Sequence, residues 1–244
     1  MRIPRICVFK QFEIGDEVQL PVQASEHLAR VLRLERGHPI VLFNGNGREY
    51  QAEISELTKR AVSARILAEQ DATNRESPLQ LTLAQGVARG EKMDLILQKA
   101  TELGVARIVP LITGRTEVKL DAERTARRLA HWQAVIAGAC EQSGRVRLPT
   151  LEAPVRLASW ASELDATAGL RLALDPGGDV TPRSLPGFEV ATLVVGPEGG
   201  LSDQDLSVLD QTDFLGLRLG PRILRTETAG LAAITALQAI HGDI

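Results

Sequence analysis

The chain has 244 residues, of which 44% are hydrophobic and 24% charged, and its formal net charge is −3. These values are typical of an ordinary soluble globular protein with one or two domains. They exclude a membrane protein, since no apolar run approaches the ~20 residues of a membrane helix. They also give no global signal for nucleic-acid binding, so any such function must rest on local patches.

The amino-terminal segment and the cysteines indicate a cytoplasmic protein. The opening M-R-I-P-R-I-C lacks the long apolar core of a signal peptide. Cys7 and Cys140 are far apart in sequence and follow no metal-ligand spacing, which favours reduced thiols. The four histidines form no ligand pattern either, so no metal is expected.

Residues 1–72 read as a β-rich domain. Asn44-Gly45-Asn46-Gly47 is a strong hairpin signal between two of the expected strands. One helix interrupts the strands, with Ser25 as its predicted cap and Gly37 at its close. A small barrel or half-barrel is the natural architecture. The expected strands are 6–9, 39–43, 48–54 and 61–67.

Several cations of this domain are candidates for binding RNA. Arginine's planar fork suits bidentate contacts with phosphates. The alternative is a solvated helix face, balanced by Glu26 and Glu35. The candidate residues are Arg2, Arg5, His27, Arg30 and Arg33.

A polar segment, 71–78, has no periodicity and ends in proline, so we place a domain boundary there, between residues 72 and 73. From Leu79 strands and helices alternate, which predicts an α/β domain with a mainly parallel sheet. Gly104 is placed as a helix C-terminal cap. Pro110 lies within a strand, which indicates an edge or a bulge. The expected elements are strands 79–83, 105–112 and 170–174 and helices 93–103 and 121–142, with a shorter helix around Trp160.

Two glycine-proline loops follow in succession. The apolar run 190–195 stops at Gly196-Pro197, and Ser202 with Asp205 predicts a capping box for the next helix. A second strand, 214–219, stops at Gly220-Pro221, and Thr226 or Thr228 is placed as the cap of the last helix. Both loops therefore lie at the carboxyl ends of neighbouring strands, where open α/β sheets bind ligands.

The residues of these loops fit a nucleoside. Glycines at 196, 199 and 200 allow close approach and leave N–H groups to point at a ligand. Leu219, Ile223 and Leu224 offer an apolar surface beside Gly220. The alternative is a tight turn followed by core residues. The missing G-x-G-x-x-G fingerprint counts against a nicotinamide or flavin oxidoreductase.

Three further stretches contain residues that bear on ligand binding or on assembly. Arg89 to Lys92 lies between a strand and a helix, again at the carboxyl edge of the sheet, and Glu141 to Arg145 closes the long helix. These side chains suit either helix-end electrostatics or a bound polyanion. The last helix, 230–240, is apolar nearly all round and must be buried, in its own domain or against a second subunit.

Taken together, several stretches resemble the bacterial ribosomal RNA small subunit methyltransferase E family of the SPOUT class. The stretches are R-I-P-R-I from Arg2, H-L-A-R-V-L-R from His27, R-G-E-K-M-D-L-I-L-Q-K-A-T-E-L-G-V from Arg89, C-E-Q-S-G-R from Cys140, G-P-E-G-G-L-S from Gly196 and L-G-P-R-I-L-R-T-E-T-A from Leu219. The resemblance spans essentially the whole chain.

This resemblance implies a PUA-like RNA-binding β-barrel domain at residues 1–72. It also implies a SPOUT methyltransferase domain at residues 73–244, with a C-terminal trefoil knot. It further implies a homodimer, S-adenosylmethionine as methyl donor, and methylation at N3 of one uridine in 16S ribosomal RNA of the small ribosomal subunit. The alternatives are a SPOUT enzyme that acts on another RNA position and a non-catalytic RNA-binding assembly protein.

The sequence thus predicts three groups of site residues. As catalytic residues we expect Glu141 or Glu198 as base, and Arg145 or Arg225 to steady the developing anion. Arg89, Lys92 and Arg145 join the RNA-binding candidates. The predicted cofactor residues are Leu174, Gly196, Pro197, Glu198, Gly199, Gly200, Leu217, Leu219, Gly220, Arg222, Ile223, Leu224, Arg225 and Thr226.

Overall fold

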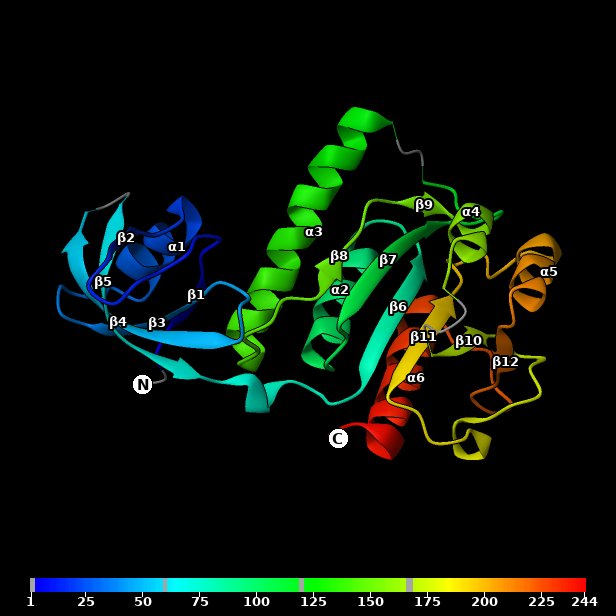
Figure 1. Cartoon of the computed structure of the whole chain (residues 1–244). Helices are drawn as coiled ribbons and strands as arrows, with labels where there is room; N and C mark the ends of the chain where they lie inside the picture. The colour runs from blue at the N-terminus through cyan, green and yellow to red at the C-terminus, as the bar shows by residue number, and fades with distance from the viewer. Residues whose placement is uncertain (1–2, 59–60, 119–120, 166–168) are drawn as a thin grey trace. The chain divides into compact units, whose positions relative to one another are not determined.

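The structure is a computed structural model that describes residues 3–58, 61–118, 121–165 and 169–244. The chain forms two compact units (Figure 1). The first unit comprises residues 1–76 and 140–148, and the second comprises residues 77–139 and 149–244. The domain boundary between residues 72 and 73 stays a prediction.

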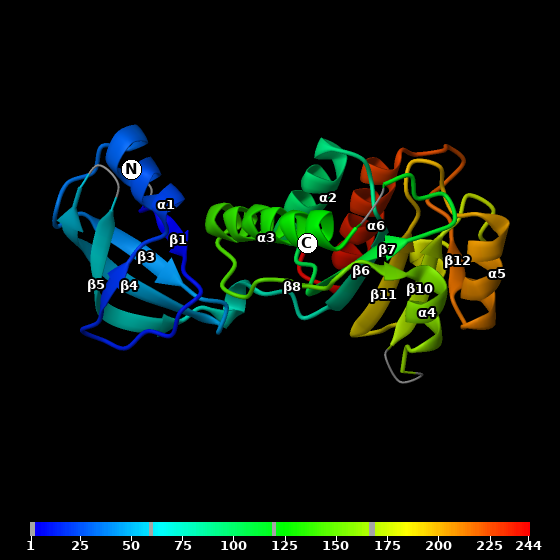
Figure 2. The same cartoon turned by 90° about the horizontal axis from the view of Figure 1, so that it is seen from above.

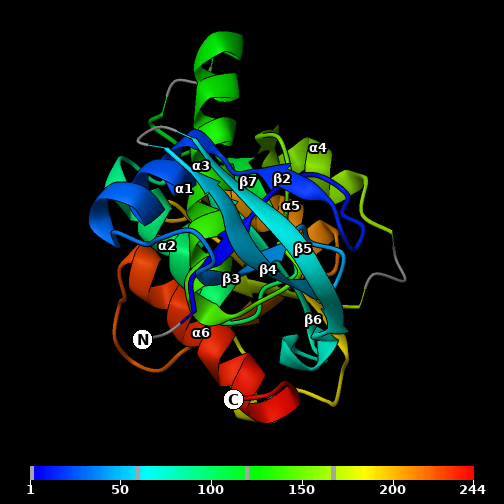
Figure 3. The same ribbon diagram turned by 90° about the vertical axis from the view of Figure 1, so that its left-hand side faces the viewer.

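The first unit is built on a curled five-stranded sheet (Figure 3). Its strand order is β1-β3-β4-β5-β2, with β1 parallel to β3 and the other neighbours antiparallel. The β-rich prediction is confirmed, although the sequence reading missed β2. The strands are β1 (Arg5–Cys7), β2 (Glu17–Gln19), β3 (Pro39–Phe43), β4 (Arg48–Leu57) and β5 (Val62–Asp71).

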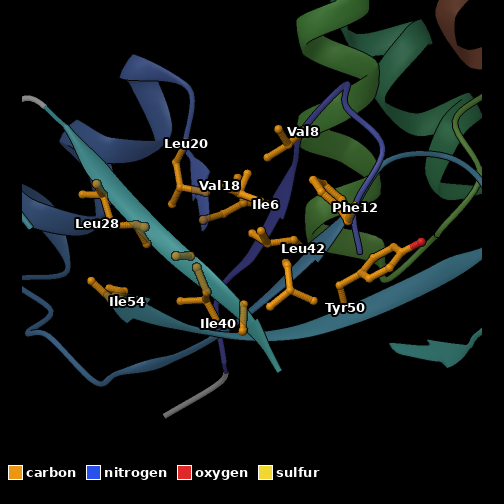
Figure 4. Close-up of a cluster of buried hydrophobic side chains, with 14 of the residues drawn as sticks. Ile6, Val8, Phe12, Val18, Leu20, Leu28, Ile40, Leu42, Tyr50 and Ile54 are labelled. Carbon is orange, nitrogen blue, oxygen red and sulfur yellow. The ribbon is translucent and has the colours of Figure 1, made fainter. Parts of the chain in front are cut away.

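Apolar side chains from all five strands fill the inside of this curled sheet (Figure 4). Leu28, from the helical segment, is 1% exposed and closes the cluster. Phe12 meets Tyr50 edge-on, with ring centroids 4.8 Å apart. Burying each such side chain contributes roughly 1.5–3 kcal/mol. This cluster therefore supplies most of the stability of the first unit.

The helical segment begins earlier than the sequence predicts. Helix α1 (Val22–Glu26) has Pro21 at its N-cap and continues as a π-helical turn, His27–Val31. Ser25 lies inside α1, where its buried hydroxyl accepts a hydrogen bond from the Val62 N–H at 3.1 Å. The predicted Ser25 cap is therefore wrong, because this hydroxyl joins the helix to strand β5 instead.

Buried ion pairs tie segment 140–148 to the strands of the first unit. The carboxylate of Glu76 accepts from Arg145 Nη2 at 2.8 Å and from the N–H groups of Val146 and Arg147 at 2.9 and 3.0 Å. Arg5 pairs with Glu49, and its Nη2 donates to the Arg145 carbonyl at 2.9 Å. The end of the long helix therefore belongs to the first unit.

We predict that Glu76→Gln destabilises the first unit by about 3–5 kcal/mol, because it removes the carboxylate that balances the buried Arg145 charge. Denaturant unfolding followed by circular dichroism measures this loss. The matched control is Glu69→Gln, which breaks the exposed pair with Arg48 and should cost less than about 1 kcal/mol. Equal losses in the two variants would contradict the prediction.

The second unit contains a sheet whose strands are all parallel in the described residues. Its order is β12-β10-β11-β6-β7-β8, and β9 also pairs with β7. This confirms the predicted parallel α/β domain. The strands are β6 (Gln80–Gly86), β7 (Arg107–Ile112), β8 (Thr150–Leu151), β9 (Val155–Arg156), β10 (Leu170–Leu174), β11 (Val190–Val195) and β12 (Leu215–Leu217).

Helices cover both faces of this sheet (Figure 2). Helices α2 (Glu91–Glu102) and α6 (Thr226–His241) pack together on one face, and α4 (Leu157–Ser162) and α5 (Asp203–Gln211) pack together on the other. Trp160 and Phe214 belong to the core between α4, α5 and the sheet. The long helix α3 spans Ala122–Ser143, close to the predicted range.

Two predictions about backbone irregularities are informative. Gly104 follows α2 with φ +86°, as a C-terminal cap requires. Pro110 lies in β7 with β6 on one side; on the other side, β8 pairs at Arg107–Ile108 and β9 at Leu111–Ile112. The proline thus occupies the gap between two short partners, where its missing N–H leaves no ladder bond unmade.

Helix α6 fastens the beginning of the second unit to its end. Gln238 is fully buried, accepts a hydrogen bond from the Ser77 hydroxyl at 2.7 Å and donates to the Leu103 carbonyl at 2.8 Å. Leu237 is also fully buried within the chain, whereas Ile240 is 47% exposed. Helix α6 is therefore buried on one side only.

The described residues contain neither a membrane-spanning helix nor a cluster suited to a metal ion. None of their helices combines the length and the apolar character that crossing a membrane requires. No cluster of His, Cys, Asp and Glu side chains in the same residues is suited to hold a metal ion. Cys7 and Cys140 are both buried free thiols.

Candidate active site

A pocket of about 360 Å³ lies at the carboxyl ends of β10, β11 and β12. All fourteen predicted cofactor residues line it, so the structure brings the two glycine-proline loops together around one cavity. The pocket also has lining residues that the sequence reading missed: Arg115, Asp175, Pro176, Val195, Leu201, Leu206 and Ala229. Asp175-Pro176 directly follows a predicted strand, so the rule that located the other loops would have found it.

The loop after β11 is a tight turn as well as a wall of the pocket. Gly200 donates its N–H to the Pro197 carbonyl at 2.9 Å. A Cβ on Gly199 would lie 3.2 Å from Cβ of Arg115, so a larger residue there would press on its neighbour or fill the cavity. The loop is therefore a tight turn that also lines the pocket, and its role in binding a ligand stays a prediction.

A buried hydrogen-bond network joins this loop to the start of α6. The Thr226 hydroxyl donates to the Gly196 carbonyl at 2.6 Å. Gln85, fully buried at the end of β6, donates to the same Thr226 oxygen at 3.0 Å and to the Gly86 carbonyl at 2.9 Å. Arg225 is the N-cap of α6, without a side-chain cap bond, so the predicted Thr226 or Thr228 cap is wrong.

We predict that Thr226→Val lowers the free energy of unfolding by about 1 kcal/mol, because it removes the hydroxyl that joins Gly196 to α6. Both side chains are β-branched, so helix propensity changes little. Chemical denaturation measures the loss. Thr228→Val, exposed in the same helical turn, is the control and should stay within about 0.5 kcal/mol of the parent. A Thr226→Val variant as stable as its control would refute this role.

Glu198 is held by the loop that follows β6. Its Oε1 accepts the Arg89 N–H at 3.0 Å and lies 3.3 Å from Nζ of Lys92. Partial burial raises the pKa of Glu198, but these donors outweigh it and hold the pKa below its usual value. The Arg89 side chain pairs with Glu117. Glu198 is thus an anchored carboxylate and a weaker base than an ordinary glutamate.

Glu141 and Arg145, two of the predicted catalytic residues, do not line this pocket. Both belong to the first unit. Glu141 Oε1 accepts the Cys7 N–H at 2.9 Å, and burial raises the pKa of Glu141 although that bond opposes the rise. Arg145 is 6% exposed and pairs with Glu76. Glu198 and Arg225 are the two predicted catalytic residues at the pocket.

The RNA-binding candidates fall into different environments. Arg2 lies outside the described residues. Arg5 and Arg145 are buried in ion pairs, so in this structure they hold the first unit together. The exposed candidates are His27, Arg30 and Arg33 in the first unit and Arg89 in the second, where Lys92 is half-buried. Nη1 of Arg30 lies 3.7 Å from Oε1 of Glu26, Arg89 pairs with Glu117, and Lys92 pairs with Glu198. Their role in RNA binding stays a prediction.

Each of the two units is matched by the model of a known protein family. A family model described as RNA methyltransferase domain matches residues 75–238, and one described as RNA methyltransferase PUA domain matches residues 20–67. A parallel sheet with a pocket at the carboxyl ends of three neighbouring strands, preceded by a curled PUA-like β unit, is the SPOUT-like arrangement. Fold, pocket and family models together define an RNA methyltransferase.

Individual relatives indicate a narrower family than these models do. The ribosomal RNA small subunit methyltransferase E of Buchnera aphidicola is 32% identical over all of this chain and 98% of its own length, and that of Bacillus subtilis is 30% identical over 96% of each. The structure of the same enzyme from Neisseria gonorrhoeae, bound to S-adenosylmethionine, is 36% identical with a TM-score of 0.90 over 100% of both chains. A Legionella pneumophila methyltransferase solved with bound cofactor SAM is 42% identical with a TM-score of 0.94, also over 100% of both chains. The chain belongs to the ribosomal RNA small subunit methyltransferase E family.

Proposed function

We propose that the chain is an S-adenosylmethionine-dependent methyltransferase that methylates N3 of a specific uridine in 16S ribosomal RNA of the small ribosomal subunit. The pocket at the ends of β10, β11 and β12 carries this proposal, because it lies where open α/β sheets bind ligands and combines glycine loops with apolar side chains. The names of the full-length relatives, and the S-adenosylmethionine bound in two of their structures, support the donor and the class of RNA.

The residues of the pocket fit the donor. A volume of about 360 Å³ lies in the range of small-molecule sites. Leu219, Ile223 and Leu224 would hold the base, with Ile223 78% exposed in the open cavity, and the N–H groups around Gly199 would hold polar groups. Bound S-adenosylmethionine supplies an activated methyl group on its sulfonium. The protein therefore mainly contributes proximity and alignment, which together can supply roughly 7–11 kcal/mol.

The uridine imide must lose its N3 proton, which calls for a base and a cation. Glu198 and Glu141 are the candidate bases, and their pKa values are shifted in opposite directions. Arg225, which lines the pocket, would steady the anion that forms on the uracil ring. Arg145 would need another role, because its guanidinium is engaged by Glu76.

Methyl transfer from labelled S-adenosylmethionine into ribosomal RNA, followed by mapping of the modified nucleotide in RNA from a deletion strain, tests the proposal. A missing methyl group at uridine N3 of 16S ribosomal RNA is the expected result. Loss of a methyl group elsewhere would favour a SPOUT enzyme acting on another position. No methyl transfer at all would leave a non-catalytic RNA-binding assembly protein.

We predict that Gly199→Val abolishes binding of S-adenosylmethionine. A valine side chain would fill the slot beside Arg115, while the fold survives because Gly199 lies in a loop at the rim. Isothermal titration calorimetry measures binding, and circular dichroism checks the fold. Gly187→Val is the control, since a Cβ there meets nothing within 4 Å. Undiminished binding by Gly199→Val would remove the loop from the donor site.

The opposite pKa shifts make the base testable. A base must be deprotonated, so methylation falls as the pH drops through its pKa. If Glu141 acts, the single-turnover rate should fall at a pH above the usual glutamate pKa; if Glu198 acts, it should fall below that value. Replacing the glutamate that acts as base, by Glu141→Gln or Glu198→Gln, should remove this fall of the rate at low pH. If Ala substitutions at both positions leave the rate unchanged at every pH, neither glutamate is the base.

We also propose how the enzyme contacts RNA, how it assembles and where it acts. Exposed cations of the first unit, Arg30 and Arg33, would contact RNA phosphates. A homodimer would cover the exposed side of α6, which includes Ile240. Because its proposed substrate is ribosomal RNA, we also propose a cytoplasmic location for the enzyme.

A further inference from the structure

The turn after β7 forms a wall of the pocket that lies outside both glycine-proline loops. Arg115 in this turn lines the pocket and donates from Nη1 to the Gly199 carbonyl at 2.8 Å. The stem of Arg115 lies against the same glycine, where a Cβ would meet Cβ of Arg115 at 3.2 Å. Arg115 therefore fixes the place of Gly199 by a hydrogen bond and by contact.

The turn itself is short and closed by its own threonines. The N–H of Thr113 donates to Oγ1 of Thr116 at 2.9 Å, and the N–H of Thr116 donates to the Thr113 carbonyl at 3.1 Å. Between them, the Gly114 N–H donates to the carboxylate of Asp205, at 3.1 Å from Oδ2 and 3.2 Å from Oδ1. Asp205 is the first-turn acid of α5, on another element.

Asp205 has a second set of partners. Its Oδ2 accepts the N–H and the hydroxyl of Ser202 at 2.9 and 2.7 Å, which completes the capping box of α5. Asp205 is 7% exposed, so its contacts are screened little by solvent ions. Gly114 has to be a glycine here, because a Cβ would lie 2.8 Å from Oγ of Ser202 and 3.3 Å from Oδ2 of Asp205.

We propose that Asp205 is a positioning residue of the donor site: through Gly114 it holds the Thr113–Thr116 turn so that Arg115 closes over Gly199 and completes the pocket. This inference rests on the proposed function, in which the pocket binds S-adenosylmethionine. A capping box alone needs only Ser202 and Asp205. The additional bond to Gly114 transmits the position of α5 to a residue that lines the pocket.

The test compares two variants that damage the capping box of α5, only one of which also removes the acceptor of the Gly114 N–H, with a third variant at Gly114 itself. Asp205→Ala removes both the cap carboxylate and the acceptor of Gly114, whereas Ser202→Ala removes half of the cap and leaves Asp205 beside Gly114. Gly114→Ala keeps both capping residues but sets a methyl group against Oγ of Ser202 and Oδ2 of Asp205, so the turn and the cap must move apart. Isothermal titration calorimetry gives the Kd for S-adenosylmethionine, and single-turnover methylation at saturating donor gives the rate.

We expect Asp205→Ala and Gly114→Ala each to raise the Kd about tenfold, with the rate at saturating donor within about twofold of the parent. Ser202→Ala should lose a comparable amount of thermal stability to Asp205→Ala and keep its Kd within about twofold. Because Asp205 acts through Arg115, the double variant Asp205→Ala/Arg115→Ala should bind no more weakly than Arg115→Ala alone.

Three results would overturn the inference: an unchanged Kd in Asp205→Ala and Gly114→Ala, an equal rise in Ser202→Ala, or fully additive losses in the double variant. If the parent protein itself binds no S-adenosylmethionine, the proposed function fails and the inference fails with it. That outcome is distinguished by the parent titration alone, before any variant is compared.

Discussion

The pocket depends on one constraint, the parallel pairing of the three successive strands β10, β11 and β12. Strand β10 pairs with β11 on one side and with β12 on the other, so three loops emerge at the same edge of the sheet. Antiparallel pairing would send neighbouring loops to opposite edges. The partly buried hydrogen bonds that Gln85 and Thr226 donate to the Gly196 carbonyl then join the loop after β11 to the end of β6 and to the start of α6.

Local rules predicted the second unit well where the local sequence decides the structure. The Ser202–Asp205 capping box, the strand at 190–195 and the cap at Gly104 each depend on a few adjacent residues and were predicted correctly. Thr226 has the same chemistry as a cap, but its hydroxyl binds the Gly196 carbonyl. A partner thirty positions away is invisible to a rule that compares neighbours.

The same limit explains the other differences. Arg115 was missed because its role depends on a turn held by Asp205, ninety residues further along the chain. Spacing also does not reveal burial, and it gave no sign that Arg5 and Arg145, both predicted to bind RNA, are enclosed with carboxylates. Strands β8 and β9 are two residues each, too short to show any periodicity.

The bonds from Gln238 to Ser77 and Leu103 have a consequence for biosynthesis. Ser77, the first residue of the second unit, and Leu103, at the end of helix α2, both bond to a side chain that is synthesised later, by about 160 and 135 positions respectively. A ribosome must therefore release α6 before this unit can close, and the sheet stays incompletely covered until then. Nascent chains of this design depend on protection from aggregation until that helix has emerged.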